Sequence, residues 1–103
     1  MNKTFKRFLE DTLKATQKEL KQVNFPYLEV SKRDTRKDGK VYRGIMIKSN
    51  HPDAPYASVF YLEEAYKDFK TNPYNLDEFA TKLIFLFLIE YNYITSCMAD
   101  ETI

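Results

Sequence analysis

Residues 27–48, YLEVSKRDTRKDGKVYRGIMIK, decide the fold of this chain. Apolar and polar residues alternate on both sides of Asp38-Gly39, and an Asp-Gly pair between two alternating runs is the strongest short signal for a β-hairpin. If this pair forms a two-residue type I′ turn, Lys37 faces Lys40, and the numbers of paired residues add to 77. The segment therefore predicts two antiparallel strands with a defined register.

The predicted register separates the two faces of the hairpin. It sets Val30 opposite Ile47 on one face and Glu29 opposite Lys48, an attractive charge pair, on the other. A shift of one residue would turn both faces over. We therefore expect Val30, Ile45 and Ile47 in the hydrophobic core.

The segments on either side of the hairpin read as helices and one more strand. Before it, apolar residues recur at spacings of three, four and seven, which is typical of an amphipathic helix. After it, Asn75 resembles a helix N-cap with Glu78 three positions later. The expected elements are helices over 3–23, 63–70 and about 76–94, and strands over 27–33, 41–48 and 56–62. The predicted fold class is α+β: an N-terminal helix, a three-stranded antiparallel sheet with its hairpin at Asp38-Gly39, then two C-terminal helices. Both faces of the third strand are apolar, so the sequence does not show which of them faces the core.

Composition favours one packed domain. The chain has 103 residues, of which 44% are hydrophobic and 16% aromatic. We expect a single α+β domain over 1–94 and a frayed C-terminal tail over 95–103.

Cys97 is the only cysteine, which suits a reducing compartment. Charges interrupt the N-terminal region, and no apolar run approaches the roughly 20 residues of a membrane span, so we expect a cytoplasmic protein without a membrane partner.

Charge is divided sharply along the chain. Residues 1–50 hold thirteen Lys/Arg and six Asp/Glu, a balance of +7, and residues 51–103 hold three and nine, a balance of −6. Such a division favours different partners at the two poles.

The basic pole is concentrated at the hairpin. A positively charged hairpin end can bind an acidic protein or enter a nucleic-acid groove, and it can equally be a solvated loop whose charge discourages strand pairing. The candidate partner-binding residues are Lys32, Arg33, Arg36, Lys37, Lys40, Tyr42 and Arg43.

The acidic pole gathers near the starts of the two later helices. Acidic residues are favoured there by the helix dipole, and the same residues could instead form a partner-binding face that mimics a phosphate backbone. The candidates are Glu63, Glu64, Asp68, Asp77 and Glu78.

The last helix is apolar on every side over 83–89, LIFLFLI. A helix that is apolar all round must be covered on more than one side. Either the sheet and another helix cover it, or one flank is an interface with a second copy or a partner. The residues expected in that interface are Phe85, Leu86, Leu88 and Ile89.

Catalytic and metal-binding patterns are missing from the sequence. His51 is the only histidine, and no spacing pairs it with Ser49, Ser58 or Cys97 as a nucleophile. A zinc site would need further His or Cys ligands, and Cys97 lies far away in the sequence. Neither glycine lies in a phosphate-binding loop. We therefore expect no catalytic residues, no metal, no cofactor and no enzymatic activity.

A resemblance adds a suggestion of origin. The passages SVFYLEEAYKDFK at 58–70 and NLDEFA at 75–80 resemble an uncharacterised domain-of-unknown-function family of gut Gram-positive bacteria and their mobile elements. The resemblance runs over about 5–85 and leaves out the C-terminal end of the chain. Members of that family are longer, and no activity is implied by the resemblance.

Together these patterns predict a small non-enzymatic protein-binding module. One concrete version is a phage or mobile-element inhibitor of a nucleic-acid-targeting bacterial defence protein. The alternatives are a nucleic-acid-binding accessory protein that uses the basic hairpin, and a structural homodimer.

Overall fold

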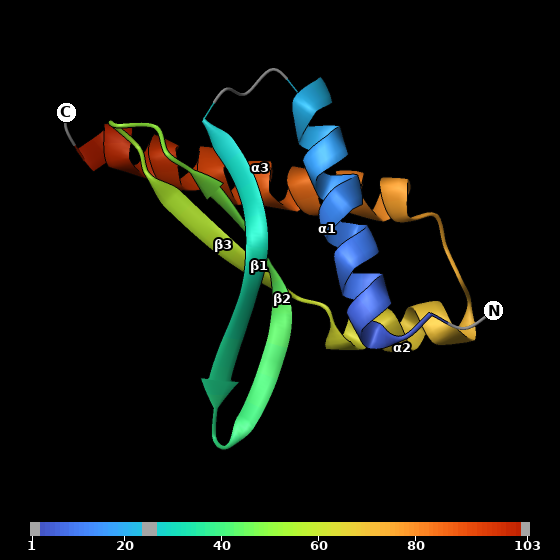
Figure 1. Ribbon diagram of the computed structural model, residues 1–103. Helices are drawn as coiled ribbons and strands as arrows, with labels where there is room; N and C mark the ends of the chain where they lie inside the picture. Colours follow the sequence, from blue (N-terminus) through green and yellow to red (C-terminus); the bar gives the residue numbers. More distant parts are fainter. Residues whose placement is uncertain (1–2, 24–26, 102–103) are drawn as a thin grey trace.

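The computed structural model describes residues 3–23 and 27–101, with side chains as far as Ser96. The order of elements is a helix, three strands and two helices, as the sequence predicted (Figure 1). The elements are α1 (Phe5–Gln22), β1 (Leu28–Lys37), β2 (Lys40–Ser49), β3 (Tyr56–Tyr61), α2 (Glu63–Thr71) and α3 (Leu76–Glu101). The sheet is antiparallel with strand order β1-β2-β3, so the predicted α+β fold is confirmed.

The hairpin has the predicted register. Lys37 faces Lys40, Glu29 faces Lys48 and Val30 faces Ile47. Asp38 and Gly39 have φ angles of +53° and +76°. A type I′ turn requires positive φ at both central residues, so the local turn chemistry explains the register.

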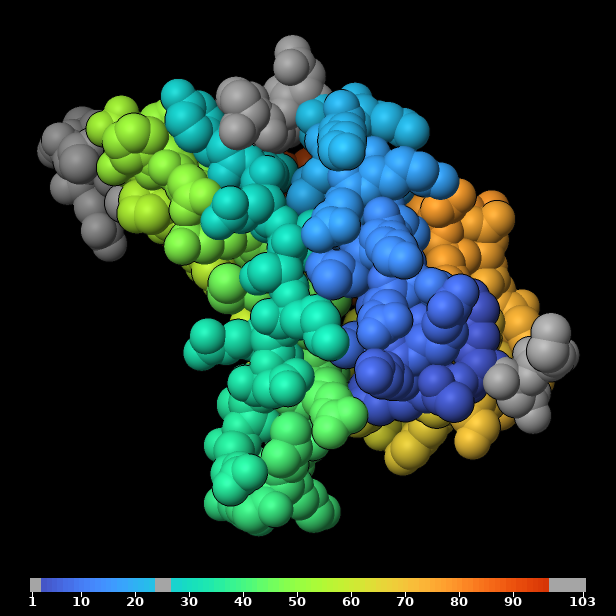
Figure 2. All heavy atoms as spheres, viewed as in Figure 1, coloured from blue at the N-terminus to red at the C-terminus, as the bar shows by residue number. Residues whose placement is uncertain are grey.

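The hairpin extends well beyond the third strand. β3 pairs with β2 only from Ser49 back to Gly44, whereas β1 and β2 stay paired as far as Lys37 and Lys40. Residues 34–43 therefore form a two-stranded ribbon, whose turn end projects away from the rest of the molecule (Figures 1 and 2).

The inward face of β3 follows from its register. Phe60 lies opposite Ile45 and Ser58 lies opposite Ile47. Because Ile45 and Ile47 are fully buried, Ser58 and Phe60 share the inward face, and Tyr61 and its alternate neighbours lie on the outer face of the sheet.

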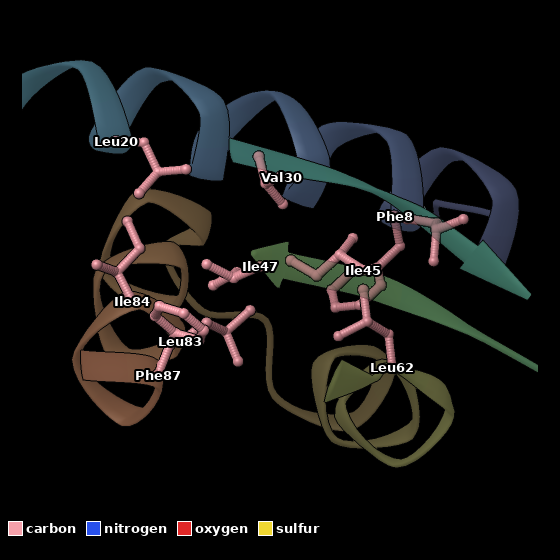
Figure 3. Close-up of a cluster of buried hydrophobic side chains, with 10 residues drawn as sticks. Phe8, Leu20, Val30, Ile45, Ile47, Leu62, Leu83, Ile84 and Phe87 are labelled. Carbon is pink, nitrogen blue, oxygen red and sulfur yellow. The ribbon is translucent and has the colours of Figure 1, made fainter. Parts of the chain in front are cut away.

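The core lies between one face of the sheet and the three helices. Val30, Ile45 and Ile47 are buried there, as predicted (Figure 3). Phe8 of α1 is fully buried and its ring packs against rings of α2 and α3. Apolar residues from every helix join this cluster: Phe8, Leu9 and Leu20 from α1, Leu83, Ile84 and Phe87 from α3, with Ala65, Tyr66 and Phe69 of α2 packed against it.

α3 continues past its expected end. The sequence placed that end near Ile94, and the helix runs to Glu101. No Gly or Pro follows Pro73, so nothing interrupts helix propagation. Thr95 Oγ1 also donates to the Tyr91 carbonyl oxygen at 2.9 Å. Residues 102–103 of the predicted tail lie outside the described residues.

Candidate functional site

α3 has one side in the core. The residues on that side recur at helical spacing and are almost completely buried, because they face the sheet and α1. They are Ala80, Leu83, Ile84 and Phe87. The helix is therefore covered on its inner side only, within the described residues.

The outer side of α3 is also apolar, and it is exposed. Phe85, Leu86, Ile89 and Tyr93 have 60%, 42%, 65% and 71% of their surface open to solvent. Spacings of three, four and seven place them along one side of the helix. We call these four residues the α3 strip.

The four residues predicted for an interface on this helix differ in exposure. Phe85, Leu86 and Ile89 lie in the strip, but Leu88 is half-buried and packs against the core. Leu88 immediately precedes Ile89, and successive side chains on a helix are rotated by about 100°. The Leu88 side chain therefore points away from the strip and toward the core. Tyr93 takes its place in the exposed set.

The charged residues next to the strip are mostly acidic. Glu78 and Lys82 continue its line toward the start of α3, and Glu90 follows Leu86 by one turn. Glu90 Oε2 accepts a hydrogen bond from the Tyr56 hydroxyl at 3.2 Å. The pKa of Tyr56 is raised above its usual range, mainly because its side chain is partly buried and also because its hydroxyl donates to Glu90.

The five acidic residues predicted as one face lie on two helices, and two of them contact other residues of the protein. Glu63 Oε2 accepts the Arg43 main-chain N–H at 2.6 Å, and Asp77 pairs with Lys18 at 2.8 Å. The Asp77 contact raises the pKa of Lys18. Three of the five come from α2 and two from α3: Glu63, Glu64, Asp68, Asp77 and Glu78.

The hairpin presents its basic residues on two opposite faces. The register sets Lys32, Arg36 and Arg43 on the inward-facing side, and Arg33, Lys37, Lys40 and Tyr42 on the outer side. The Tyr42 ring meets Tyr61 edge-on at 5.9 Å and is half-buried. Tyr42 therefore packs within the sheet, on the face opposite to that of Arg43.

A cleft lies where the start of α1 meets the hairpin. It has a volume of about 260 Å³ and is lined by Phe5, Lys6, Leu9, Lys32, Asp34 and Arg43. Sequence analysis identified Lys32 and Arg43 but missed the other four, because the contact between α1 and the hairpin is tertiary and has no local sequence signal.

The residues considered for catalysis have structural partners. His51 Nδ1 accepts the Asp53 N–H at 3.1 Å, and its ring meets Tyr27 edge-on. Ser49 is 1% exposed, and its hydroxyl donates to the Tyr91 hydroxyl at 3.2 Å. Tyr91 in turn donates to the Ala54 carbonyl oxygen at 2.9 Å. These contacts tie the loop 50–55 to α3.

Two kinds of feature are absent from the described part of the chain. In it, no three His, Cys, Asp or Glu side chains gather in a way that could hold a metal ion. Among the helices of those same residues, none has the length and hydropathy needed to cross a bilayer.

Comparisons with known proteins find no matching family model, no matching curated protein and no matching solved structure. The resemblance to the family of gut bacteria and mobile elements stays a prediction.

Proposed function

We propose that this chain is a non-enzymatic protein-binding module that docks a partner protein through the α3 strip. The observation that carries the proposal is the exposure of Phe85, Leu86, Ile89 and Tyr93 along one side of a single helix. Contiguous apolar patches are uncommon on soluble monomers outside interaction sites. Aromatic side chains are also enriched at the centres of protein interfaces.

The charge near the strip favours a different protein over a second copy. Residues 51–103 carry a balance of −6, and beside the strip two carboxylates, Glu78 and Glu90, accompany one cation, Lys82, which leaves a local balance of −1. Two copies that met through this surface would bring like charges together, which opposes association. A partner with an apolar groove and a basic rim would be complementary on both counts.

The contacts of the catalytic candidates support a non-enzymatic role. A general base must reach a nucleophile and a reacting proton. Ser49 is buried under the loop 50–55, and His51 Nδ1 already accepts a main-chain N–H. A finer version of the same function is that the chain is encoded by a phage or mobile element and inhibits a bacterial defence protein. This inhibitor would use the same strip.

The proposal is tested by capture with matched variants. Wild-type protein, Ile89→Glu and Gln17→Glu are immobilised and exposed to a lysate of cells that produce the chain. Both substitutions add one negative charge at an exposed helix position, and only Ile89 lies in the strip. We expect a protein that the wild type and Gln17→Glu retain and that Ile89→Glu loses. Equal retention by all three would contradict docking through α3.

A second candidate function rests on the projecting ribbon. Residues 34–43 extend past β3 and carry basic side chains on both faces. A two-stranded ribbon fits the major groove of DNA, and phosphate contacts make such binding strongly dependent on salt. A mobility-shift assay at two salt concentrations tests this function. The triple substitution Arg36→Ala, Lys37→Ala and Lys40→Ala should abolish a specific shift, and no shift at low salt would remove this candidate.

A further inference from the structure

We propose that the cleft between α1 and the hairpin binds a short acidic peptide segment of a partner protein, with one apolar side chain of the segment inserted between the charged walls. This site is separate from the α3 strip and does not depend on the function proposed for it. The cleft joins an apolar floor, a cationic rim and a fixed wall.

The floor of the cleft is apolar and well supported. Leu9 is 2% exposed and belongs to the core. Phe5 is half-buried, and its ring stacks on Tyr66 at a centroid distance of 5.3 Å. An apolar side chain placed on this floor would lose its contact with water, which favours binding.

The rim of the cleft is cationic. Lys6, Lys32 and Arg43 are exposed there with a single carboxylate, Asp34, which leaves a balance of +2. Among the described residues, no carboxylate lies within 4.0 Å of these three cationic groups, whereas Lys18 has an ion-pair partner at 2.8 Å. The rim can therefore accept carboxylates from outside the chain without first breaking an internal pair.

One wall of the cleft is held in place by the main chain. The Arg43 N–H donates to Glu63 Oε2 at 2.6 Å, and its carbonyl oxygen accepts the Leu62 N–H at 3.0 Å. These two bonds fix the Arg43 backbone at the point where β2 leaves the three-stranded sheet. A rigid wall reduces the entropy that is lost when a ligand binds.

The size and the aromatic contacts of the cleft favour a peptide over a nucleotide. Its volume of about 260 Å³ is below the roughly 300–1,000 Å³ of typical small-molecule sites, and it suits one or two side chains. Base recognition needs an exposed aromatic face. One face of Phe5 is stacked on Tyr66, and Tyr42 lies on the opposite side of the hairpin.

The test is a titration followed by NMR of the backbone amides of the full chain. The probe is the peptide acetyl-Glu-Asp-Phe-Asp-Glu-amide, and the control peptide replaces each acid with its amide. We expect saturable shifts at Lys6, Leu9 and Arg43, with a dissociation constant below about 1 mM for the acidic probe. The control peptide should bind at least about tenfold more weakly, because several charge contacts are lost.

Two double variants locate the site. Lys32→Gln with Arg43→Gln removes two charges from the cleft, and Arg36→Gln with Lys40→Gln removes two from the ribbon outside it. Binding of the acidic probe should fall about tenfold in the first and less than about threefold in the second. Equal losses, no saturable shift, or binding of oligothymidylate in preference to the peptide would each overturn the proposal.

Discussion

The main-chain N–H of Arg43 donates a hydrogen bond of 2.6 Å to Glu63 Oε2. This bond joins the position where the hairpin leaves the sheet to the first residue of α2. The other carboxylate oxygen, Oε1, is buried and accepts no hydrogen bond from the described residues. A residue that the sequence suggested for an acidic surface is therefore a structural link between the hairpin and the helices.

Replacing Glu63 should destabilise the fold. In Glu63→Ala the Arg43 N–H loses its partner, and we expect the free energy of unfolding to fall by about 1–3 kcal/mol. The matched control is Glu64→Ala, an exposed carboxylate one residue later, which should change stability by less than about 0.5 kcal/mol. Urea denaturation followed by circular dichroism measures both. Similar values for the two variants would show that the bond contributes nothing.

Gly44 should be the less tolerant of the two glycines. A Cβ atom at Gly44 would collide with the Phe60 carbonyl oxygen of β3, and a Cβ atom at Gly39 would meet nothing within 4 Å. We expect Gly44→Ala to cost about 3 kcal/mol, because β2 and β3 must separate. Gly39→Ala should cost about 1 kcal/mol from its positive φ alone. Thermal or urea unfolding that ranked the two in the opposite order would contradict the β2–β3 pairing.

Acid should remove the contribution of Asp11. Its carboxylate lies 2.8 Å from Lys3 Nζ and 3.5 Å from Arg7 Nε. The hydrogen bond from Lys3 is the main reason that the pKa of Asp11 lies below its usual 3.8. A depressed pKa gives stability that is complete above the unfolded value and is lost as pH falls through the folded value.

The variant Asp11→Asn checks this sign. The exposed pair is worth at most about 1 kcal/mol, so the variant should be less stable than wild type by that amount or less at pH 7. The difference should shrink as the pH falls below 3.8. Lys3→Gln breaks the same pair and should lower stability in the same pH range. A difference that grew toward low pH would contradict the assignment.

Two neighbouring substitutions test which side of α3 is exposed. Ile89 is 65% exposed, whereas Leu88 packs against the core. Ile89→Glu should leave the free energy of unfolding within about 0.5 kcal/mol of wild type, and Leu88→Glu should lower it by about 2 kcal/mol or more.

Light scattering should give the 12.3 kDa monomer mass for wild type. Twice that mass, reduced to the monomer by Ile89→Glu, would make the strip a homodimer interface.

The features that could be predicted from the sequence are those that local interactions determine. The turn chemistry of Asp38-Gly39 and the alternation around it set the register and the burial of Val30, Ile45 and Ile47. Asn75 caps α3 as predicted, because its Oδ1 accepts the main-chain N–H groups of residues 77 and 78. Each of these features depends on residues close together in the sequence.

The surfaces depend on tertiary packing, and sequence analysis resolved them only in part. A helix that is apolar all round gives no sign of which side its neighbours cover, so Leu88 was grouped with Phe85, Leu86 and Ile89. The cleft was missed because Phe5 and Leu9 meet Arg43 only after α1 packs on the sheet. The five acidic residues come from two helices, and two of them, Glu63 and Asp77, already contact Arg43 and Lys18.

Photo-crosslinking in living cells tests the central claim most directly. A benzophenone amino acid replaces Phe85 in the strip or, as a control, Gln17 on the exposed side of α1. The account predicts that irradiation joins the probe at position 85 to one protein other than this chain. The probe at position 17 should give no such product. No product from Phe85, or the same product from both positions, would contradict docking through the α3 strip.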